Sequence, residues 1–256
     1  MAKVVSFNSF LAVLSLSIIT QGFAHGSVTE TNDSTLESPL ESLIAQETRD
    51  AIDARKEVKA LDANADSRLD SFNGSREVDL RHRDTDIKQQ FSAKKCAGFI
   101  KSKVGTCSAF GLAAAAENLL VGKVDFSERH LWSQYCVPSS KSAIKALTSG
   151  KGVIEETWWP QNYKYAPGSY SKATRFKVFE SRLLEDDVPS MLEALARGNP
   201  LYLALNTPSE MKAHKAVISA GSGRTGGGHA VAIVGYRLDE TVEGGGYLLV
   251  KNSWGA

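Results

Sequence analysis

The chain has 256 residues, with 30 lysines and arginines against 29 aspartates and glutamates, so its formal net charge is +1 at pH 7. This length is enough for one or two domains with a sizeable core. The near balance of charge gives no electrostatic attraction toward nucleic acid or an anionic membrane, so we expect neither as a partner. Composition alone therefore predicts a soluble globular protein and leaves its chemistry open.

The first 24 residues have the pattern of a secretory signal peptide. Lys3 precedes an apolar run over residues 10–19, and Gly22-Phe23-Ala24 offers small residues for cleavage after Ala24. The apolar run is short for a membrane span, so an uncleaved anchor is the less favoured alternative. We therefore expect an exported protein, located in a secreted, periplasmic or lysosome-like compartment after removal of residues 1–24.

Residues 25–77 are polar and charged and contain few aromatic residues. Their apolar residues recur at near-helical spacing, which favours one or two amphipathic helices. Their position between a signal peptide and a folded domain is typical of a pro-segment. A flexible linker is the alternative.

Farther along the chain, predicted helices come before predicted strands. Residues 111–121, rich in Ala and Leu and free of proline, predict a helix, as do residues 140–147 and 189–197. Leu201–Leu205 follows a Gly-Asn-Pro break and predicts a buried strand. The apolar runs 230–236 and 247–250, separated by a glycine-rich turn, predict a β-hairpin. This order is typical of an α+β protein with two lobes.

We expect the helix that contains residues 111–121 to begin at about Cys107, so that the cysteine lies on its first turn. The free N–H groups and positive dipole end of a helix stabilise a thiolate, and the thiolate is the nucleophilic form of cysteine. A catalytic cysteine also needs a base and a group that orients the base. His229, within Gly-Gly-His-Ala-Val, and Asn252, within Lys-Asn-Ser-Trp-Gly, are the candidates. A lone cysteine or histidine is more often structural, but three such passages in this order favour a catalytic site.

The order Cys, His, Asn resembles the papain-like cysteine peptidases, in which the His and Asn follow the Cys by roughly 130–150 residues. Here the distances from Cys107 are 122 residues to His229 and 145 to Asn252. Val78-Asp79-Leu80-Arg81 is similar to the start of the mature enzymes. The resemblance covers residues 78–256, and implies a two-lobed peptidase domain with a helical left lobe and an antiparallel, barrel-like right lobe.

The resemblance also implies a role for each residue of the site. Cys107 would attack the scissile carbonyl carbon, His229 would carry the proton, and Asn252 would orient the imidazole. Trp254 would cover the bond between His229 and Asn252 and exclude water from it. No cofactor is implied, and no Cys/His spacing is typical of a zinc site.

The oxyanion donor departs from the family pattern. In the family it is a glutamine six residues before the cysteine, where this chain has Lys101. Ile87-Lys88-Gln89-Gln90 resembles the family's Val-Lys-Asn-Gln but lies farther upstream. An insertion of about ten residues, around residues 91–100, would leave Gln90 as the donor. Lys101 is the alternative, although a cation there would compete with His229 for the thiolate.

The resemblance extends to the substrate groove and to a disulfide. Gly152 to Trp159 and Leu203 to Leu205 occupy the family's groove walls, so the candidate lining residues are Gly152, Trp159, Leu203 and Leu205. In the family, a cysteine just upstream of the nucleophile bridges to one after a Ser-Glu-x-x-Leu segment. Val104 holds the usual upstream position here, so the implied pair is Cys96 with Cys136.

The sequence thus predicts an exported, monomeric cysteine endopeptidase that acts on peptides or proteins, with residues 25–77 as its own inhibitor. The main alternative is a weak or inactive relative that binds peptides through the same cleft. It is motivated by the altered spacing from Gln90 to Cys107 and by the end of the chain at Ala256, where the right lobe would lack further strands and expose a sheet edge. An acyl- or peptidyl-transferring enzyme would use the same residues.

Overall fold

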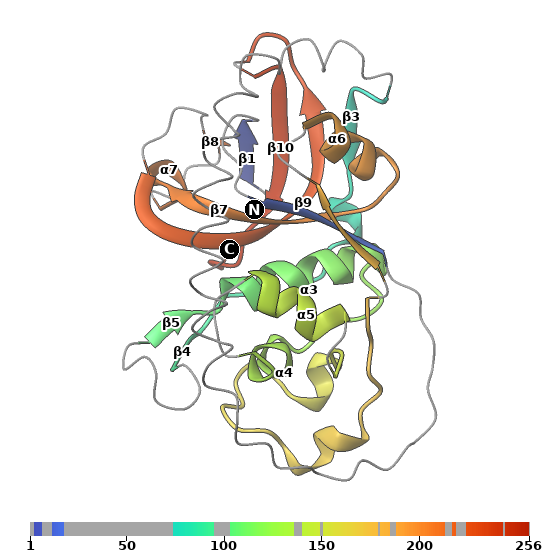
Figure 1. Cartoon of the computed structure of the whole chain (residues 1–256), viewed down its shortest axis with the longest axis vertical. Coiled ribbons are helices and arrows are strands. Elements are labelled where there is room, and N and C mark those ends of the chain that lie inside the picture. Colours follow the sequence, from blue (N-terminus) through green and yellow to red (C-terminus); the bar gives the residue numbers. More distant parts are fainter. Residues whose placement is uncertain are drawn as a thin grey trace.

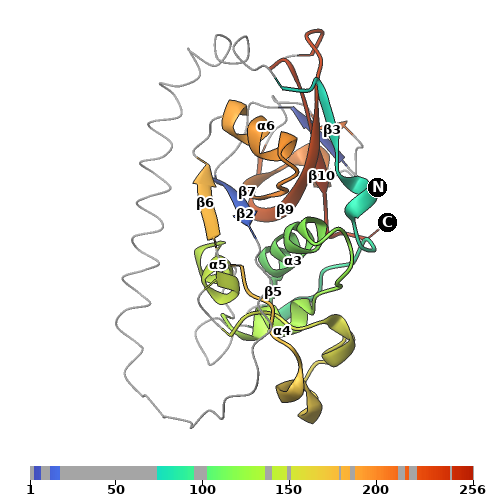
Figure 2. The ribbon, with the colours of Figure 1, turned by 90° about the vertical axis from the view of Figure 1, so that its right-hand side faces the viewer.

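A computed structural model describes residues 3–6, 12–17, 74–94, 103–135, 140–148, 151–178, 180–184, 188–212, 217–218, 224–242 and 244–255. In this part of the chain, one lobe is built from helices and the other from a twisted sheet (Figures 1 and 2). This arrangement agrees with the α+β fold in two lobes that the order of the elements predicts. No helix among the described residues is both long and apolar enough to cross a membrane.

The helical lobe is organised around α3 (Cys107–Leu119), which is buried along almost its whole length. Its run of alanines keeps its sides narrow, so the helix packs closely on neighbours in both lobes. The helix α4 (Glu128–Ser133) is capped by Ser127, whose side chain accepts a hydrogen bond from the backbone N–H of His130. The remaining helical elements of this lobe are α5 (Ser140–Thr148) and the 3-10 turns η1 (Arg81–Arg83), η2 (Glu156–Trp158) and η3 (Gly168–Lys172).

The sheet lobe contains one large sheet with the strand order β6-β2-β7-β9-β10-β1-β8, and β3 pairs with β9 beside it. Neighbouring strands are antiparallel, except that β1 and β8 are parallel. No pairing joins β6 to β8, so the described sheet is open rather than a closed barrel. The strands are β1 (Lys3–Ser6), β2 (Ala12–Ser17), β3 (Glu77–Asp79), β6 (Glu180–Leu184), β7 (Leu201–Pro208), β8 (Val217–Ile218), β9 (Arg224–Leu238) and β10 (Gly246–Lys251), and α6 (Val188–Ala196) and α7 (Ser209–Lys212) lie against them.

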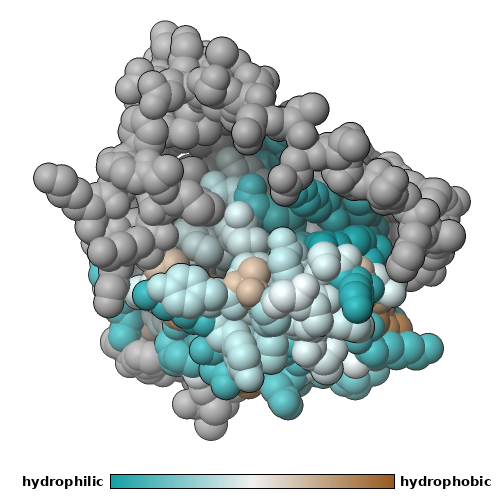
Figure 3. Space-filling model, turned by 90° about the horizontal axis from the view of Figure 1, so that it is seen from below, coloured by the Kyte–Doolittle hydropathy of each residue, from teal (hydrophilic) through white to brown (hydrophobic). Residues whose placement is uncertain are grey.

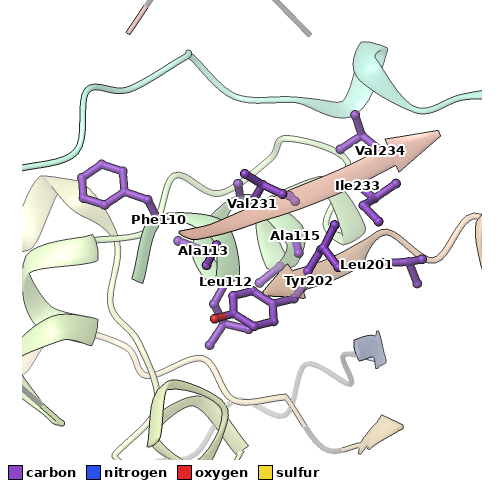
Figure 4. Close-up of a cluster of buried hydrophobic side chains, with 14 of the residues drawn as sticks. Phe110, Leu112, Ala113, Ala115, Leu201, Tyr202, Val231, Ile233 and Val234 are labelled. Atoms are coloured by element: carbon purple, nitrogen blue, oxygen red, sulfur yellow. The ribbon is translucent and has the colours of Figure 1, made fainter. Parts of the chain in front are cut away.

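The two lobes meet where α3 packs against β9 and β7. Buried apolar side chains from these elements form the core there (Figure 4). Gly111 permits the close approach, because a Cβ at this position would lie 3.0 Å from the backbone nitrogen of Val231. The labelled core residues are Phe110, Leu112, Ala113, Ala115, Leu201, Tyr202, Val231, Ile233 and Val234.

A small two-stranded sheet separates Gln90 from Cys107. Its strands are β4 (Ser92–Lys94) and β5 (Lys103–Gly105), which pair antiparallel and project from the N-terminal end of α3 (Figure 1). The sequence predicts an inserted loop that bulges outward here and returns the chain to register. The described residues show such an excursion, and both of its arms are strands. We refer to β4 and β5 together as the inserted hairpin.

The strands β1 and β2 lie inside the predicted signal peptide. β1 pairs with β10, and β2 lies between β6 and β7. The edge of β10, which the sequence predicts to be exposed, is therefore covered by β1 in this structure. Cleavage after Ala24 would remove both strands, and the signal peptide stays a prediction. The predicted helices of residues 25–77 lie outside the described residues, apart from the last four positions.

Candidate active site

Cys107 is the first residue of α3, where the sequence places it. It has a free thiol and is partly buried. The backbone of Ala230, the residue that follows His229 on β9, lies close enough to the thiol to lower its pKa. The packing of α3 against β9 therefore brings the predicted nucleophile beside the segment that carries the predicted base.

Burial raises the pKa of the Cys107 thiol above its ordinary value. Hydrogen bonds with the backbone of Ala230 and of Ser108, and the backbone of Cys107 itself, act in the opposite direction. The start of a helix is thus not sufficient by itself to make this thiol a thiolate. A thiolate requires a nearby group that takes up the proton and remains as its cationic partner.

His229, Asn252 and Trp254 form the second part of the site. The imidazole Nε2 lies 2.7 Å from Oδ1 of Asn252, and both residues are buried. Because an amide oxygen only accepts hydrogen bonds, Nε2 carries a proton and Nδ1 is the basic nitrogen of the neutral ring. The indole ring of Trp254 lies against the imidazole, with ring centroids 4.5 Å apart. The structure thus brings these three predicted residues together.

Ser253, which sequence reasoning did not single out, joins the base to the predicted oxyanion donor. Its backbone N–H donates to Oδ1 of Asn252 at 2.9 Å, and its hydroxyl donates to Oε1 of Gln90 at 2.8 Å. The backbone N–H of Gln90 in turn donates to the carbonyl oxygen of Ser253 at 2.7 Å. The position of Ser253 inside Lys-Asn-Ser-Trp-Gly was the available signal.

Gln90 lies close to the turn that carries Cys107, in spite of the altered spacing. A Cβ on Gly105 would be 3.2 Å from Nε2 of Gln90. The inserted hairpin explains this proximity. Ser92 and Gly105 are paired across it, so the chain enters and leaves the hairpin at neighbouring points. With Oε1 bound to Ser253, the amide nitrogen of Gln90 is the end that remains to donate. Lys101, the alternative donor, lies outside the described residues.

The family profile described as papain family cysteine protease matches residues 75–256. This chain belongs to the papain family of cysteine proteases.

Individual relatives agree with this assignment. Cathepsin B-like CP3 and cathepsin B-like CP2 of Giardia intestinalis are 41% and 39% identical to the chain, each over 70 residues. These matches cover 27% of the chain and 23% of each relative's length. The shared segment is therefore less than a quarter of either curated relative.

Two solved proforms have a similar fold. The Amb a 11 cysteine protease of ragweed pollen is 23% identical, with a TM-score of 0.52, over 73% of this chain and 59% of its own. Digestive procathepsin L 3 of Tenebrio molitor is 22% identical, with a TM-score of 0.50, over 71% of this chain and 60% of its own. These likenesses show the papain-like fold.

The four residues expected to line the substrate groove are all buried in the structure. Trp159 is buried in a small cluster with Ile154 and Ala173, and Leu203 and Leu205 are buried in the main core. Along β7 the burial alternates, so the half-buried residues are their neighbours Ala204 and Asn206. Leu203 and Leu205 therefore lie on the inward face of β7, because successive side chains of a strand point to opposite faces. Gly152 is buried too and has a positive φ of 73°.

An ionic cluster lies behind the site, in the helical lobe, and it is buried except for Asp125 at its exposed edge. The ammonium of Lys88 lies 2.6 Å from Oδ1 of Asp125 and 3.0 Å from Oε1 of Glu128, and it also donates to the carbonyl oxygen of Phe126. Glu117 accepts from the backbone N–H of Phe126 and from the hydroxyl of Thr85. We call Lys88, Glu117, Asp125, Glu128 and the more distant Glu156 the Lys88 cluster.

The Lys88 cluster contains more carboxyl groups than cations, so its charges do not balance. Burial alone would lower the pKa of Lys88, but the carboxylates around it raise it above its ordinary value. Burial raises the pKa of Glu128 and Glu117, and Lys88 offsets only part of this. Because the ion-pair distances are short, we take Lys88 as charged. The proton that burial favours in this cluster is then shared among the carboxyl groups.

The cluster reaches the base side of the site through Lys251, the residue before Asn252. Its ammonium donates to the carbonyl oxygen and hydroxyl of Thr85, at 3.1 and 3.2 Å. A small cavity lies between the lobes here, lined on one side by Lys88, Glu117 and Glu128 and on the other by Lys251 and Asn252. Sequence reasoning missed this network, because its members are up to 166 positions apart.

The remaining expectations are not tested by the described residues. Cys96 and Cys136, the implied disulfide pair, both lie outside them. Within the described part of the chain, no group of three or more His, Cys, Asp or Glu side chains is arranged to hold a metal ion.

Proposed function

We propose that this chain is an exported cysteine endopeptidase that hydrolyses peptide bonds through Cys107, His229 and Asn252. The observation that carries the proposal is the continuous hydrogen-bonded series from His229 through Asn252 and Ser253 to Gln90, with the Cys107 thiol beside Ala230. It supplies a nucleophile, an oriented base and an amide donor within one site. Membership of a family of cysteine proteases supports the same chemistry.

The first half of the reaction forms a covalent acyl-enzyme. Nδ1 of His229 takes the proton of Cys107, and the thiolate sulfur attacks the scissile carbonyl carbon. The π electrons of the carbonyl move to its oxygen, which the backbone N–H of Cys107 and the amide of Gln90 stabilise. When the tetrahedral intermediate collapses, the C–N bond breaks and the imidazolium donates its proton to the leaving amine.

The second half releases the acyl group as a carboxylic acid. The neutral imidazole of His229 removes a proton from water, and the resulting hydroxide attacks the thioester carbon. Collapse of this second intermediate breaks the C–S bond, and the sulfur leaves as a thiolate that is again paired with the imidazolium. Asn252 keeps Nε2 protonated and the ring in place throughout, and Trp254 shields that bond from water.

Export and a pro-segment are part of the same proposal. The signal-like residues 1–24 support export, and the position of residues 25–77 supports an inhibitory pro-segment. The solved relatives named above as proforms are consistent with this order of segments. Edman sequencing of the protein that cells export should give His25 at the N-terminus of the precursor. An exported chain that still begins at Met1 would contradict the signal-peptide part of the proposal.

The activity is tested by labelling with a peptidyl epoxide or vinyl sulfone under mild reduction. We expect mass spectrometry to locate the label on Cys107, and His229→Ala to abolish labelling because no base then removes the thiol proton. His82→Ala is the matched control and should label normally, since His82 is an exposed histidine of η1. Failure of the folded wild-type protein to label or to cleave any fluorogenic peptide would instead support the inactive, peptide-binding alternative.

A further inference from the structure

The first turn of α3 carries the nucleophile, but no side chain caps it. Thr106 stands at the N-cap position, and its side chain forms no capping hydrogen bond. Its hydroxyl donates instead to the carbonyl oxygen of Phe91, at 2.7 Å. The orientation of this turn decides where the backbone N–H of Cys107 points, and that N–H is an oxyanion donor in the proposed mechanism. The turn therefore needs to be held by contacts other than a cap.

Ser108, the residue after the nucleophile, provides a second attachment. It is buried, and its hydroxyl oxygen lies 3.2 Å from the phenol oxygen of Tyr135, to which it is hydrogen-bonded. Cys107 thus stands between two residues, Thr106 and Ser108, whose hydroxyls are each bonded to a different segment of the chain. Attachments on both sides fix the backbone of the residue between them.

Tyr135 is itself held in place at the end of α4. Its backbone N–H donates to the carbonyl oxygen of Trp132 at 3.3 Å. Its ring packs edge-on against the buried indole of Trp132, with ring centroids 5.3 Å apart. Ser108 is therefore bonded to a phenol whose position is set by packing.

The phenol of Tyr135 is buried and lies near the nucleophile. Burial raises its pKa well above the usual value, so the group keeps its proton and remains a hydroxyl. The charge of a Cys107 thiolate acts on the same phenol and raises its pKa further. A buried hydroxyl that loses its partner has no water to replace it, so the bond with Ser108 matters more here than at the surface.

The outer surface of the helical lobe offers the contrasting case. Seen from below, its described atoms are mostly hydrophilic, and hydrophobic residues are scattered among them (Figure 3). Tyr163 of this lobe is 55% exposed, so its side chain is largely in contact with water. Removal of such a hydroxyl should change little, because water takes the place of any partner.

We propose that Tyr135 is a positioning residue that acts through Ser108 to hold the first turn of α3, and with it the backbone N–H of Cys107, in the orientation that catalysis requires. This role rests on the proposed peptidase function. Tyr135 itself touches neither substrate nor reacting atoms in this account, and its effect reaches them only through Ser108.

The test is a double-mutant cycle with Tyr135→Phe and Ser108→Ala, in a fluorogenic peptide assay. Each variant should lower kcat about threefold to tenfold with KM little changed, because a misdirected N–H weakens binding of the transition state more than that of the substrate. The double variant should lose no more than the larger single loss, since both changes remove the same bond. Circular dichroism establishes that each variant is folded.

Tyr202→Phe is the matched control. Tyr202 is a buried tyrosine of the core (Figure 4), and its phenol donates to the hydroxyl of Ser140 of α5 at 3.0 Å, away from the turn that carries Cys107. Its loss should lower the unfolding free energy and leave kcat unchanged. Tyr163→Phe, at the surface, should change neither quantity.

Three results would overturn the inference while leaving the proposed peptidase activity intact. The first is wild-type kcat in Tyr135→Phe, which would make the bond with Ser108 merely structural. The second is additive losses in the double variant, which would show that the two residues act independently. The third is an equal fall of kcat in Tyr202→Phe, which would make the effect general to buried tyrosines. Absence of both cleavage and probe labelling in the wild-type protein would overturn the proposed function itself.

Discussion

The two halves of the candidate site are held in place by different forces. On the base side, His229 lies on β9 and Asn252 directly follows β10, and the antiparallel pairing of these two strands sets their positions. On the nucleophile side, Gln90 and Cys107 lie in a lobe that contains the Lys88 cluster and depends on hydrogen bonds. Register is insensitive to pH, whereas buried carboxylates titrate. The difference teaches that a change of pH should alter the stability of the nucleophile side more than that of the base side.

The largest effect expected on this comparison comes from Lys88→Met. Among the described residues Lys88 is the cation that pairs with the buried Glu128, and its removal leaves that carboxylate uncompensated, which should cost about 3–5 kcal/mol of unfolding free energy at about pH 8. The loss should shrink toward about pH 5, because the carboxylates, whose pKa burial already raises, then take up protons. Urea unfolding at both pH values measures it.

Two further variants complete that experiment. Leu203→Ala, on the base side, should cost about 2–5 kcal/mol at both pH values, because it removes apolar packing only. Lys123→Met changes an exposed lysine and should have little effect. If Lys88→Met loses the same stability at both pH values, the proposed difference between the two halves is wrong.

Gln90→Ala tests whether the nucleophile side keeps its oxyanion donor. We expect kcat to fall about 10²- to 10³-fold, or about 2.7–4 kcal/mol, with KM little changed, because the lost hydrogen bond forms in the transition state. Gln89→Ala, at the exposed neighbouring glutamine, is the control in the same fluorogenic assay. Unchanged activity in Gln90→Ala would refute the inserted-hairpin account of this donor.

Gly111→Ala perturbs the contact that joins the two halves. The added Cβ would meet backbone atoms of Ala230 and Val231 at 3.0–3.2 Å, which forces α3 away from β9. We expect a loss of about 1–3 kcal/mol in stability and slower labelling of Cys107. Gly168→Ala, where a Cβ meets nothing within 4 Å, is the control. Wild-type labelling kinetics in Gly111→Ala would show that this spacing does not govern the site.

The last effect, which is small over any single pH unit, concerns His130, a buried histidine of the helical lobe. Burial, with smaller effects from the positive charges of Arg175 and Lys151, lowers its pKa to about 3. The unfolded chain therefore binds the proton first as the pH falls below about 6.5, and stability should drop by up to about 1.4 kcal/mol per pH unit between there and about pH 3. Unfolding of His130→Asn across this range should show a shallower slope than the wild type. Parallel slopes would contradict this assignment.

Sequence reasoning predicted the fold well where local patterns carry the information. The helices near residues 111, 140 and 189, the strand after Pro200 and the last hairpin all occur in the structure. The proximity of Gln90 to Cys107 required the family resemblance together with the insertion argument.

Other features lie beyond the reach of local patterns. Leu203 and Leu205, which were assigned to the groove, face the core, and the half-buried side chains of β7 are their neighbours. The partners of Lys88 lie about 40 positions away, so no local pattern reveals them. The strands β4 and β5 are only three residues long and rich in lysine, which gives little strand signal.

Ser253 gives the site a mechanical property as well as a chemical one. Three of its hydrogen bonds connect the amide of Asn252 to both the side chain and the backbone of Gln90, and so they join the two lobes at a single point. Separation of the lobes at this point would release the oxyanion donor. A substrate must therefore be accommodated without breaking these bonds, so the same contact that joins the lobes also keeps the amide of Gln90 in place for catalysis.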